Sequence, residues 1–119
     1  MPQSSPTLRV FIQNLLNEDF EQAREYLCSQ EQQSWSSEQL KQTWEDMLMK
    51  DEPSSPQQCS VMWDMATTSD MNDWAHKEEN DILWVYVPVV TDQANEAISA
   101  IIIQVKGQTR LRQIVFGRP

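Results

Sequence analysis

The segment ILWVYVPVVTDQANEAISAIIIQVKGQTRLRQIVF, which runs from Ile82 to Phe116, decides how this chain folds. It is dense in β-branched and aromatic residues, which are enriched in strands. Two short polar stretches, 92–95 and 107–108, interrupt it in the manner of hairpin turns. We therefore predict an antiparallel meander made of strands 82–91, 97–106 and 109–116.

Both faces of this meander are apolar. Alternate residues of a strand share a face, and we expect Thr91 to pair with Glu96 and Lys106 with Thr109. An antiparallel sheet with one wet face alternates apolar and polar residues, so both faces of this sheet should be covered. Helices can cover one face, and a second copy of the chain is the simplest cover for the other. One of the two faces carries Trp84, Tyr86, Ile101, Ile103, Arg112, Ile114 and Phe116.

The first part of the chain has helical periodicity. Pro6 suits a first helical position, and apolar residues at helical spacing continue from there to Leu16. A second helix is expected to begin at Asn17 and to end near Ser29, followed by a linker at 30–33. These segments predict two helices before the linker.

A capping box is the clearest local signal. Ser36 and Gln39, three residues apart, predict the start of a third helix, which the prolines of DEPSSP (51–56) end. The segment 58–68 is typical of a first strand, and 69–81 of a polar connection. The prediction is an α+β fold: three N-terminal helices packed on a curved antiparallel four-stranded sheet.

Length and composition indicate one acidic domain. The 119 residues with 39% hydrophobic content suffice for a single core over residues 7–117, after a disordered N-terminus at 1–6. The net charge of −9 argues against nucleic acid or an anionic membrane as partner. No apolar run approaches the roughly 20 residues of a membrane span. We expect no signal peptide and two reduced thiols, Cys28 and Cys59, and hence a cytoplasmic protein.

Four strings of sequence carry a resemblance to a known superfamily. They are NLLNEDFEQAREYLCSQ (14–30), SSEQLKQTWEDML (36–48), VYVPV (85–89) and RLRQIVFG (110–117). Together they resemble the nuclear transport factor 2-like superfamily, and within it small bacterial domains of unassigned function. The resemblance extends over about residues 7–117.

The resemblance implies a cystatin-like fold shaped as a cone, with a curled sheet wrapped around the helices and a cavity at the open end. It turns the face of Leu83 and Val85 toward the helices and the face of Trp84 outward. The seven residues named above, Trp84 among them, are therefore the expected dimer interface. Thr109 stands where a large aromatic residue is usual in the superfamily. The resemblance therefore implies that the wide end of the cone is less filled by side chains or is filled differently. Superfamily members commonly dimerise through the outer sheet face, as the apolar pattern also predicts.

The implied cavity has several candidate ligand-binding residues. Gln113 falls on the helix-facing side, where its amide must be hydrogen-bonded to a small polar ligand, a helix terminus or a water. Tyr26 and Trp44 either complete that pocket or belong to the core. Asp64, beside Trp63, either faces the cavity, where desolvation would make it a base, or points to solvent at the sheet edge.

Other catalytic groups are scarce. His76, the only histidine, lies in a polar loop and is either solvated or a base in a lid. The acidic loop around it lacks the glycine that a calcium loop needs at its sixth position. We therefore expect no metal, no cofactor and no catalytic residue.

The function predicted from these patterns is a non-enzymatic, homodimeric module that binds a small ligand or a protein partner. The resemblance leaves open an isomerase, dehydratase or cyclase that uses a carboxylate in the cone, as ketosteroid isomerase does with a cavity aspartate. A structural adaptor without a ligand is a third possibility.

Overall fold

The computed structural model describes residues 6–48, 59–71, 74–75, 80–91 and 95–117. Its helices are α1 (Pro6–Leu16), α2 (Phe20–Arg24), α3 (Ser29–Ser34) and α4 (Ser37–Met47). Its strands are β1 (Cys59–Val61), β2 (Thr67–Asp70), β3 (Asp81–Thr91), β4 (Asn95–Val105) and β5 (Gln108–Phe116), with a short 3₁₀ helix, η1 (Trp63–Met65), between β1 and β2.

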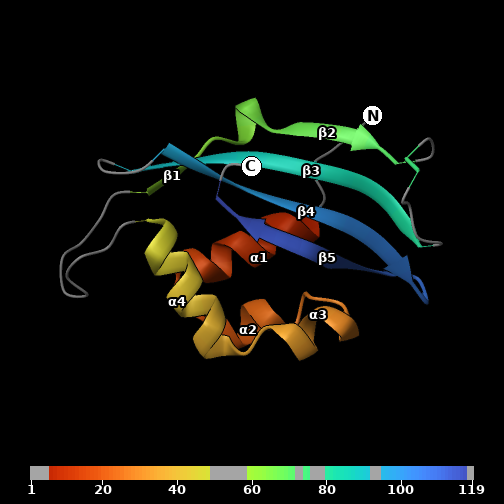
Figure 1. The fold of residues 1–119 in the computed structure, drawn as a ribbon, viewed down its shortest axis with the longest axis horizontal. Coiled ribbons are helices and arrows are strands. Elements are labelled where there is room, and N and C mark those ends of the chain that lie inside the picture. Colours follow the sequence, from red (N-terminus) through yellow and green to blue (C-terminus); the bar gives the residue numbers. More distant parts are fainter. Residues whose placement is uncertain (1–5, 49–58, 72–73, 76–79, 92–94, 118–119) are drawn as a thin grey trace.

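These elements form two layers, with the helices on one face of an antiparallel sheet (Figure 1). The strand order is β1-β3-β4-β5, and β2 pairs with β3 alongside β1. The α+β class and the C-terminal meander are confirmed. The described residues contain four helices and five strands, where the sequence predicted three and four. None of the described helices combines the length and the apolar character needed to cross a bilayer.

The additional helix arises because the second predicted helix is interrupted where the chain touches the sheet. The side chain of Asp19 caps α2, so this helix begins later than the predicted Asn17. Leu27 leaves the helical layer to form a parallel bridge with Leu111 of β5, which is why α2 ends early. The chain then resumes as α3, in the segment that was predicted to be a linker.

The predicted strand 58–68 is broken in two. β1 pairs with the C-terminal end of β3, where Cys59 lies opposite Thr91. β2 pairs with the middle of β3, where Thr67 lies opposite Tyr86. The 3₁₀ turn η1 separates the two pieces.

The predicted faces of the meander are confirmed for β3 and β4, although the register differs. Leu83 pairs with Ile102 and Val87 with Ile98, two residues away from the predicted register. The β4–β5 turn is made by Lys106 and Gly107, with φ values of 53° and 78°. A type I′ hairpin turn requires positive φ at both of these positions. A shift of two residues keeps every side chain on its face, because two is the period of a strand.

A β-bulge at Gln113 makes the predicted faces wrong at the end of β5. Gln113 has a φ of 54° and its side chain is exposed, so the strand beyond it is rotated by one position. Ile114 is therefore buried in the main core, and Phe116 packs against the same core. The Glu31 carboxylate fixes the bulge, since it accepts hydrogen bonds from the Ile114 N–H at 3.1 Å and the Trp35 indole at 3.2 Å.

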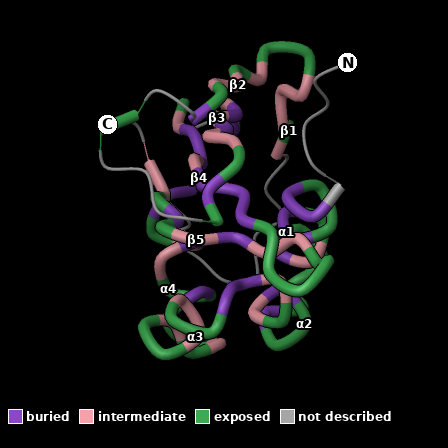
Figure 2. The backbone as a smooth tube through the Cα atoms, turned by 90° about the vertical axis from the view of Figure 1, so that its right-hand side faces the viewer, coloured by how far each residue is buried: buried purple, intermediate pink, exposed green. Residues whose placement is uncertain are grey.

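The main core lies between the two layers. Figure 2 shows buried stretches along β3, β4 and β5 and exposed stretches on the helices. At one end of the sheet, the Thr109 hydroxyl is hydrogen-bonded to the hydroxyl of Thr7 in α1. Thr109, where the resemblance implies a large aromatic residue in other members, is thus bonded to the first helix. The fully buried side chains of this core include Leu8, Phe11, Leu15, Leu27, Leu40, Val85, Val87, Ile98 and Leu111.

The predicted capping box is confirmed at the start of α4. The Ser36 hydroxyl accepts from the Gln39 N–H at 3.1 Å, and the Gln39 side chain accepts from the Ser36 N–H at 2.9 Å. Both bonds satisfy backbone donors that have no partner inside a helix.

Replacing Ser36 by alanine is expected to lower the free energy of unfolding by about 1 kcal/mol, because one of these donors loses its acceptor. Urea denaturation measures the change. Ser37→Ala is the matched control, since this neighbouring serine is the first residue of α4 and not its cap. Equal losses in the two variants would contradict a capping role for Ser36.

Candidate functional site

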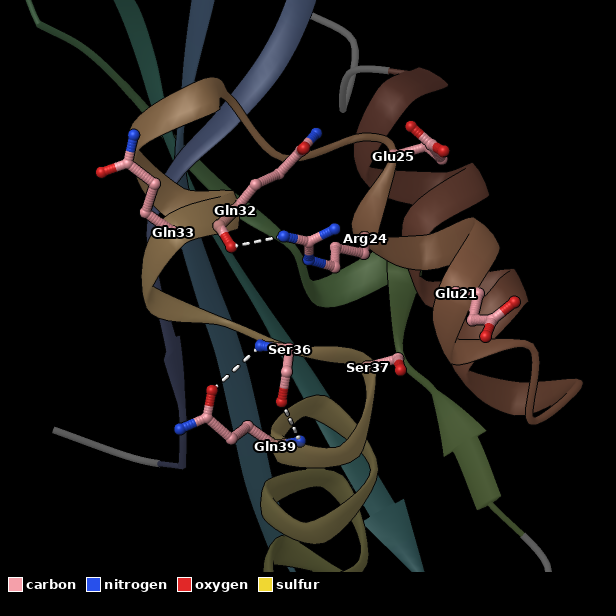
Figure 3. A pocket seen from close by; sticks show the side chains of 8 residues that line it. All are labelled: Glu21, Arg24, Glu25, Gln32, Gln33, Ser36, Ser37 and Gln39. Carbon is pink, nitrogen blue, oxygen red and sulfur yellow. Dashed lines mark hydrogen bonds between the residues drawn. The ribbon is translucent and has the colours of Figure 1, made fainter.

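A polar pocket of about 560 Å³ lies where α2, α3 and the start of α4 meet (Figure 3). Arg24 reaches across it and donates to the carbonyl oxygens of Gln32 and Trp35, both at 2.7 Å. Ser36 and Gln39 are joined to each other by the capping box. The two Arg24 bonds therefore tie α2 to α3 and to Trp35, which follows α3, while the capping box belongs to the start of α4. We call this site the helix-junction pocket.

A second pocket, of about 350 Å³, lies at the edge of the sheet beside the start of α3. Ile103, Val105 and Cys28 give it an apolar wall, and Ser29, Gln30 and Asn80 add polar groups. Asp81 and Arg112 also line it. Three of its eight lining residues are apolar and five are polar or charged. We call it the edge pocket.

A buried ion pair lies in this edge pocket. The Arg112 Nε donates to Asp81 Oδ1 at 3.0 Å, and Nη2 donates to Oδ2 at 2.6 Å. The Asp81 side chain is 1% exposed and that of Arg112 is 16% exposed. Such charge-assisted contacts are roughly twice as strong as hydrogen bonds between neutral groups. The pair ties the start of β3 to β5 across the intervening strand β4.

Three aromatic rings are arranged in a row on the outer face of the sheet, the face without helices. Trp84 and Tyr86 stand on β3 with ring centroids 5.8 Å apart, and Trp74 lies 6.1 Å from Trp84. All three rings are partly exposed. Val115 lies on the same face, because it pairs with Ser99, the partner of Tyr86, and it is 44% exposed. We call Trp74, Trp84, Tyr86 and Val115 the outer patch.

Part of the outer face is covered by the chain itself. Ile101 and Ile103 are buried in a small second core with Met71 and Cys28, against which Trp84 packs. The predicted interface residues thus divide into groups. Trp84 and Tyr86 remain accessible, Ile101 and Ile103 are covered within the chain, and Arg112 is engaged with Asp81. Ile114 and Phe116 belong to the inner face because of the bulge.

The predicted ligand-binding residues do not gather around one cavity. The amide of Gln113 is exposed, so its predicted helix-facing position is wrong. Asp64 is exposed on η1. Trp44 is a core residue, and Tyr26 and Trp63 pack against that core from outside. The Arg9 guanidinium lies over the Trp63 ring, 4.4 Å from its centroid.

The cavity that the enzymatic alternative requires would lie between the helices and the sheet. The large aliphatic and aromatic side chains of the main core lie in this region, and Asp64 is exposed. Burial raises the pKa of the Cys59 thiol above its ordinary value. Both cysteines are free thiols, as predicted.

The polar loop that contains His76 lies largely outside the described residues, and His76 is one of those not described. In the part of the chain that is described, no three side chains of His, Cys, Asp or Glu gather as a metal site would require.

Sequence reasoning missed Asp81, Met71 and Trp74. Asp81 is one of several acidic residues in a polar stretch, and nothing local distinguishes it. A signal did exist for the other two: they are large apolar residues three positions apart in the segment SDMNDWAHKEEND. Large apolar residues in an otherwise polar connection indicate that it packs on a neighbouring surface.

Comparison with known proteins adds no relative. No family model matches the chain, and neither a curated protein nor a solved structure shows a match.

Proposed function

We propose that this chain is a nuclear transport factor 2-like domain that acts as a non-enzymatic binding module, and that its partner is a second copy of itself. The contact is made through the outer patch. The observation that carries the proposal is the row of partly exposed rings of Trp74, Trp84 and Tyr86 on the helix-free face.

The chemistry of the outer patch favours a protein partner. Tryptophan and tyrosine dominate the energetically important positions of protein interfaces, often together with arginine. Here Trp84 is in contact with the rings on either side of it. Rings held in this way lose little conformational entropy when a partner docks, which favours binding.

A second copy suits this surface. In a two-fold arrangement the outer faces of two sheets pack against each other, as the sheets of a sandwich do at about 10 Å. Each chain has a net charge of −9, so two copies repel each other at long range. Arg110 stands on the outer side of β5, where it pairs with Ile103, and reduces this repulsion where the copies meet. The resemblance in sequence supports the same partner.

The exposure of the candidate carboxylate supports a non-enzymatic role. Ketosteroid isomerase-like chemistry needs a carboxylate in a cavity opposite a hydrogen-bond donor, and Asp64, the sequence's candidate, is exposed on η1. Binding by the outer face needs no such cavity.

Replacing Val115 by glutamate is expected to weaken the dimer by at least about 100-fold, because a carboxylate would be buried against apolar rings. Val115 is 44% exposed, so the single chain should tolerate the change. Size-exclusion chromatography with light scattering at micromolar concentration measures the mass of the variant.

The matched control is Val10→Glu. Val10 is 40% exposed on α1, on the helical side of the sheet, so this variant loses the same side chain and gains the same charge elsewhere. We expect it to remain dimeric while Val115→Glu has the mass of one chain. A dimer that survives both substitutions equally would refute the outer patch as the interface.

A further inference from the structure

We propose that Glu31 determines how the end of β5 pairs with β4 and, through this pairing, how tightly two copies of the chain bind each other. The inference rests on the proposed function, because the outer patch is the surface that the pairing alters. It starts from the bulge at Gln113, where the backbone has a φ of 54°. Beyond the bulge, Val115 lies on the outer face, while Ile114 and Phe116 lie on the inner face.

A second pairing of the same segment is available without the bulge. The last pair before the bulge joins Arg112 to Ile101. In a ladder that continued from this pair without an extra residue, each later residue of β5 would point to the opposite face. Ile114 and Phe116 would then lie on the outer face, and Val115 on the inner one. This is the pairing that the alternation of the sequence predicts.

The hydrophobic pattern permits both pairings, because Ile114, Val115 and Phe116 are consecutive apolar residues. Either pairing therefore gives each face of the sheet an apolar side chain. The pairing with the bulge places the two larger side chains on the inner face, but it holds Gln113 at a positive φ, which is costly for a residue other than glycine. A contact from outside the strand can decide between the two pairings.

Glu31 makes such a contact from α3. Its Oε2 accepts hydrogen bonds from the Ile114 N–H at 3.1 Å and from the Trp35 indole N–H at 3.2 Å. The Trp35 ring packs edge-on against Phe116, with the ring centroids 5.5 Å apart. One carboxylate oxygen thus holds both the backbone beyond the bulge and the ring that contacts Phe116. Without this oxygen the part-buried Ile114 N–H loses its acceptor, which penalises the bulged pairing.

The pairing determines which side chains the outer face presents to a second copy. With the bulge, the side chain opposite Ser99 is Val115. Without it, the larger Ile114 would take that place. It would lie near Tyr86, which is the partner of Ser99 in β3. Phe116 would add its ring to the same face. More apolar surface would then be buried between two copies, so a chain without the bulge should dimerise more tightly.

Two substitutions of Glu31 test the proposal. Glu31→Ala removes the acceptor, whereas Glu31→Gln keeps a carbonyl oxygen in its place. Both remove one negative charge, so a difference between them does not arise from repulsion between copies. We expect Glu31→Ala to lose the NMR cross-peaks between the rings of Trp35 and Phe116, and its dimer Kd in sedimentation equilibrium to fall at least about tenfold. Glu31→Gln should keep the cross-peaks and the Kd of the unmodified chain.

Two substitutions of Gln113 make the same test without a change in α3. Gln113→Val introduces a β-branched residue, which resists a positive φ, and should give the pairing without the bulge and the tighter dimer. Gln113→Gly is the matched control, because glycine adopts a positive φ readily and should keep the bulge, the cross-peaks and the Kd. Gln113 is exposed, so both variants should fold.

Three results would overturn the proposal. The first is persistence of the Trp35–Phe116 cross-peaks in both Glu31→Ala and Gln113→Val. The second is an unchanged dimer Kd in a variant that has lost them. The third is the same loss of cross-peaks in Glu31→Gln as in Glu31→Ala. A monomeric unmodified chain is a different result: it would refute the proposed function and with it the effect on the dimer, while the cross-peaks would still show whether Glu31 determines the pairing.

Discussion

Replacing Asp81 by alanine is expected to lower the free energy of unfolding by about 3–5 kcal/mol. The change removes the carboxylate to which the Arg112 guanidinium donates at 2.6 and 3.0 Å. The largely buried positive charge of Arg112 then no longer has the Asp81 carboxylate beside it. A domain of this size is stable by only about 5–15 kcal/mol. The variant should therefore lose a large part of its stability, which urea denaturation followed by circular dichroism measures.

Two further variants separate the charge effect from the loss of an aspartate. Asp64→Ala removes an exposed aspartate from η1 and should change stability by less than about 0.5 kcal/mol. The double variant Asp81→Leu/Arg112→Leu removes both charges and should recover most of the loss, since apolar pairs replace buried ion pairs at little cost. A loss below about 1 kcal/mol in Asp81→Ala would contradict the structural role of the pair.

Replacing Leu111 by alanine is expected to cost about 3–5 kcal/mol of unfolding free energy. The Leu111 side chain has 0% exposure and lies in the main core between the layers. Its backbone N–H donates to the Tyr26 carbonyl, and its carbonyl accepts from the Cys28 N–H, both at 2.9 Å. The residue thus stands where the helical layer joins the sheet. Truncation leaves a cavity there that neither layer can close alone.

Leu16→Ala is the matched control for this prediction. Leu16 is the last residue of α1 and is 37% exposed, so the same truncation should cost less than about 1 kcal/mol. Thermal unfolding of both variants gives the comparison. Similar losses at the two positions would show that the core does not lie where β5 meets the helices.

The layers and the strand faces could be predicted from the sequence because they depend on local periodicity. In β3 and β4 alternate residues lie on the same face, so the sequence determines which apolar residues share a face. This assignment does not change when the register shifts by two residues. The start of α4 could be predicted because all the atoms of its capping box lie within four residues.

The bulge at Gln113 could not be predicted in the same way. A positive φ is usual for glycine or asparagine and uncommon for glutamine, so the sequence carries no sign of it. The bulge depends instead on Glu31, which lies in α3 and bonds to the Ile114 N–H. One non-local contact thus moves Ile114 and Phe116 from the outer to the inner face.

The candidate site shows the same division. Their alternation in β3 puts Trp84 and Tyr86 on one face, and the resemblance predicted that this face is the outer one. The burial of Asp81 depends on Arg112, which lies 31 positions further along the chain. A polar residue that is buried by a distant partner looks like any other loop aspartate in the sequence.

The central claim is that the outer patch joins two copies of this chain. Sedimentation equilibrium of the unmodified protein, over concentrations up to about 100 μM, tests it most directly, because dimers of ordinary affinity are fully formed in that range. The account predicts a mass of twice 13.9 kDa that falls toward 13.9 kDa on dilution. A mass of 13.9 kDa at every concentration would contradict it.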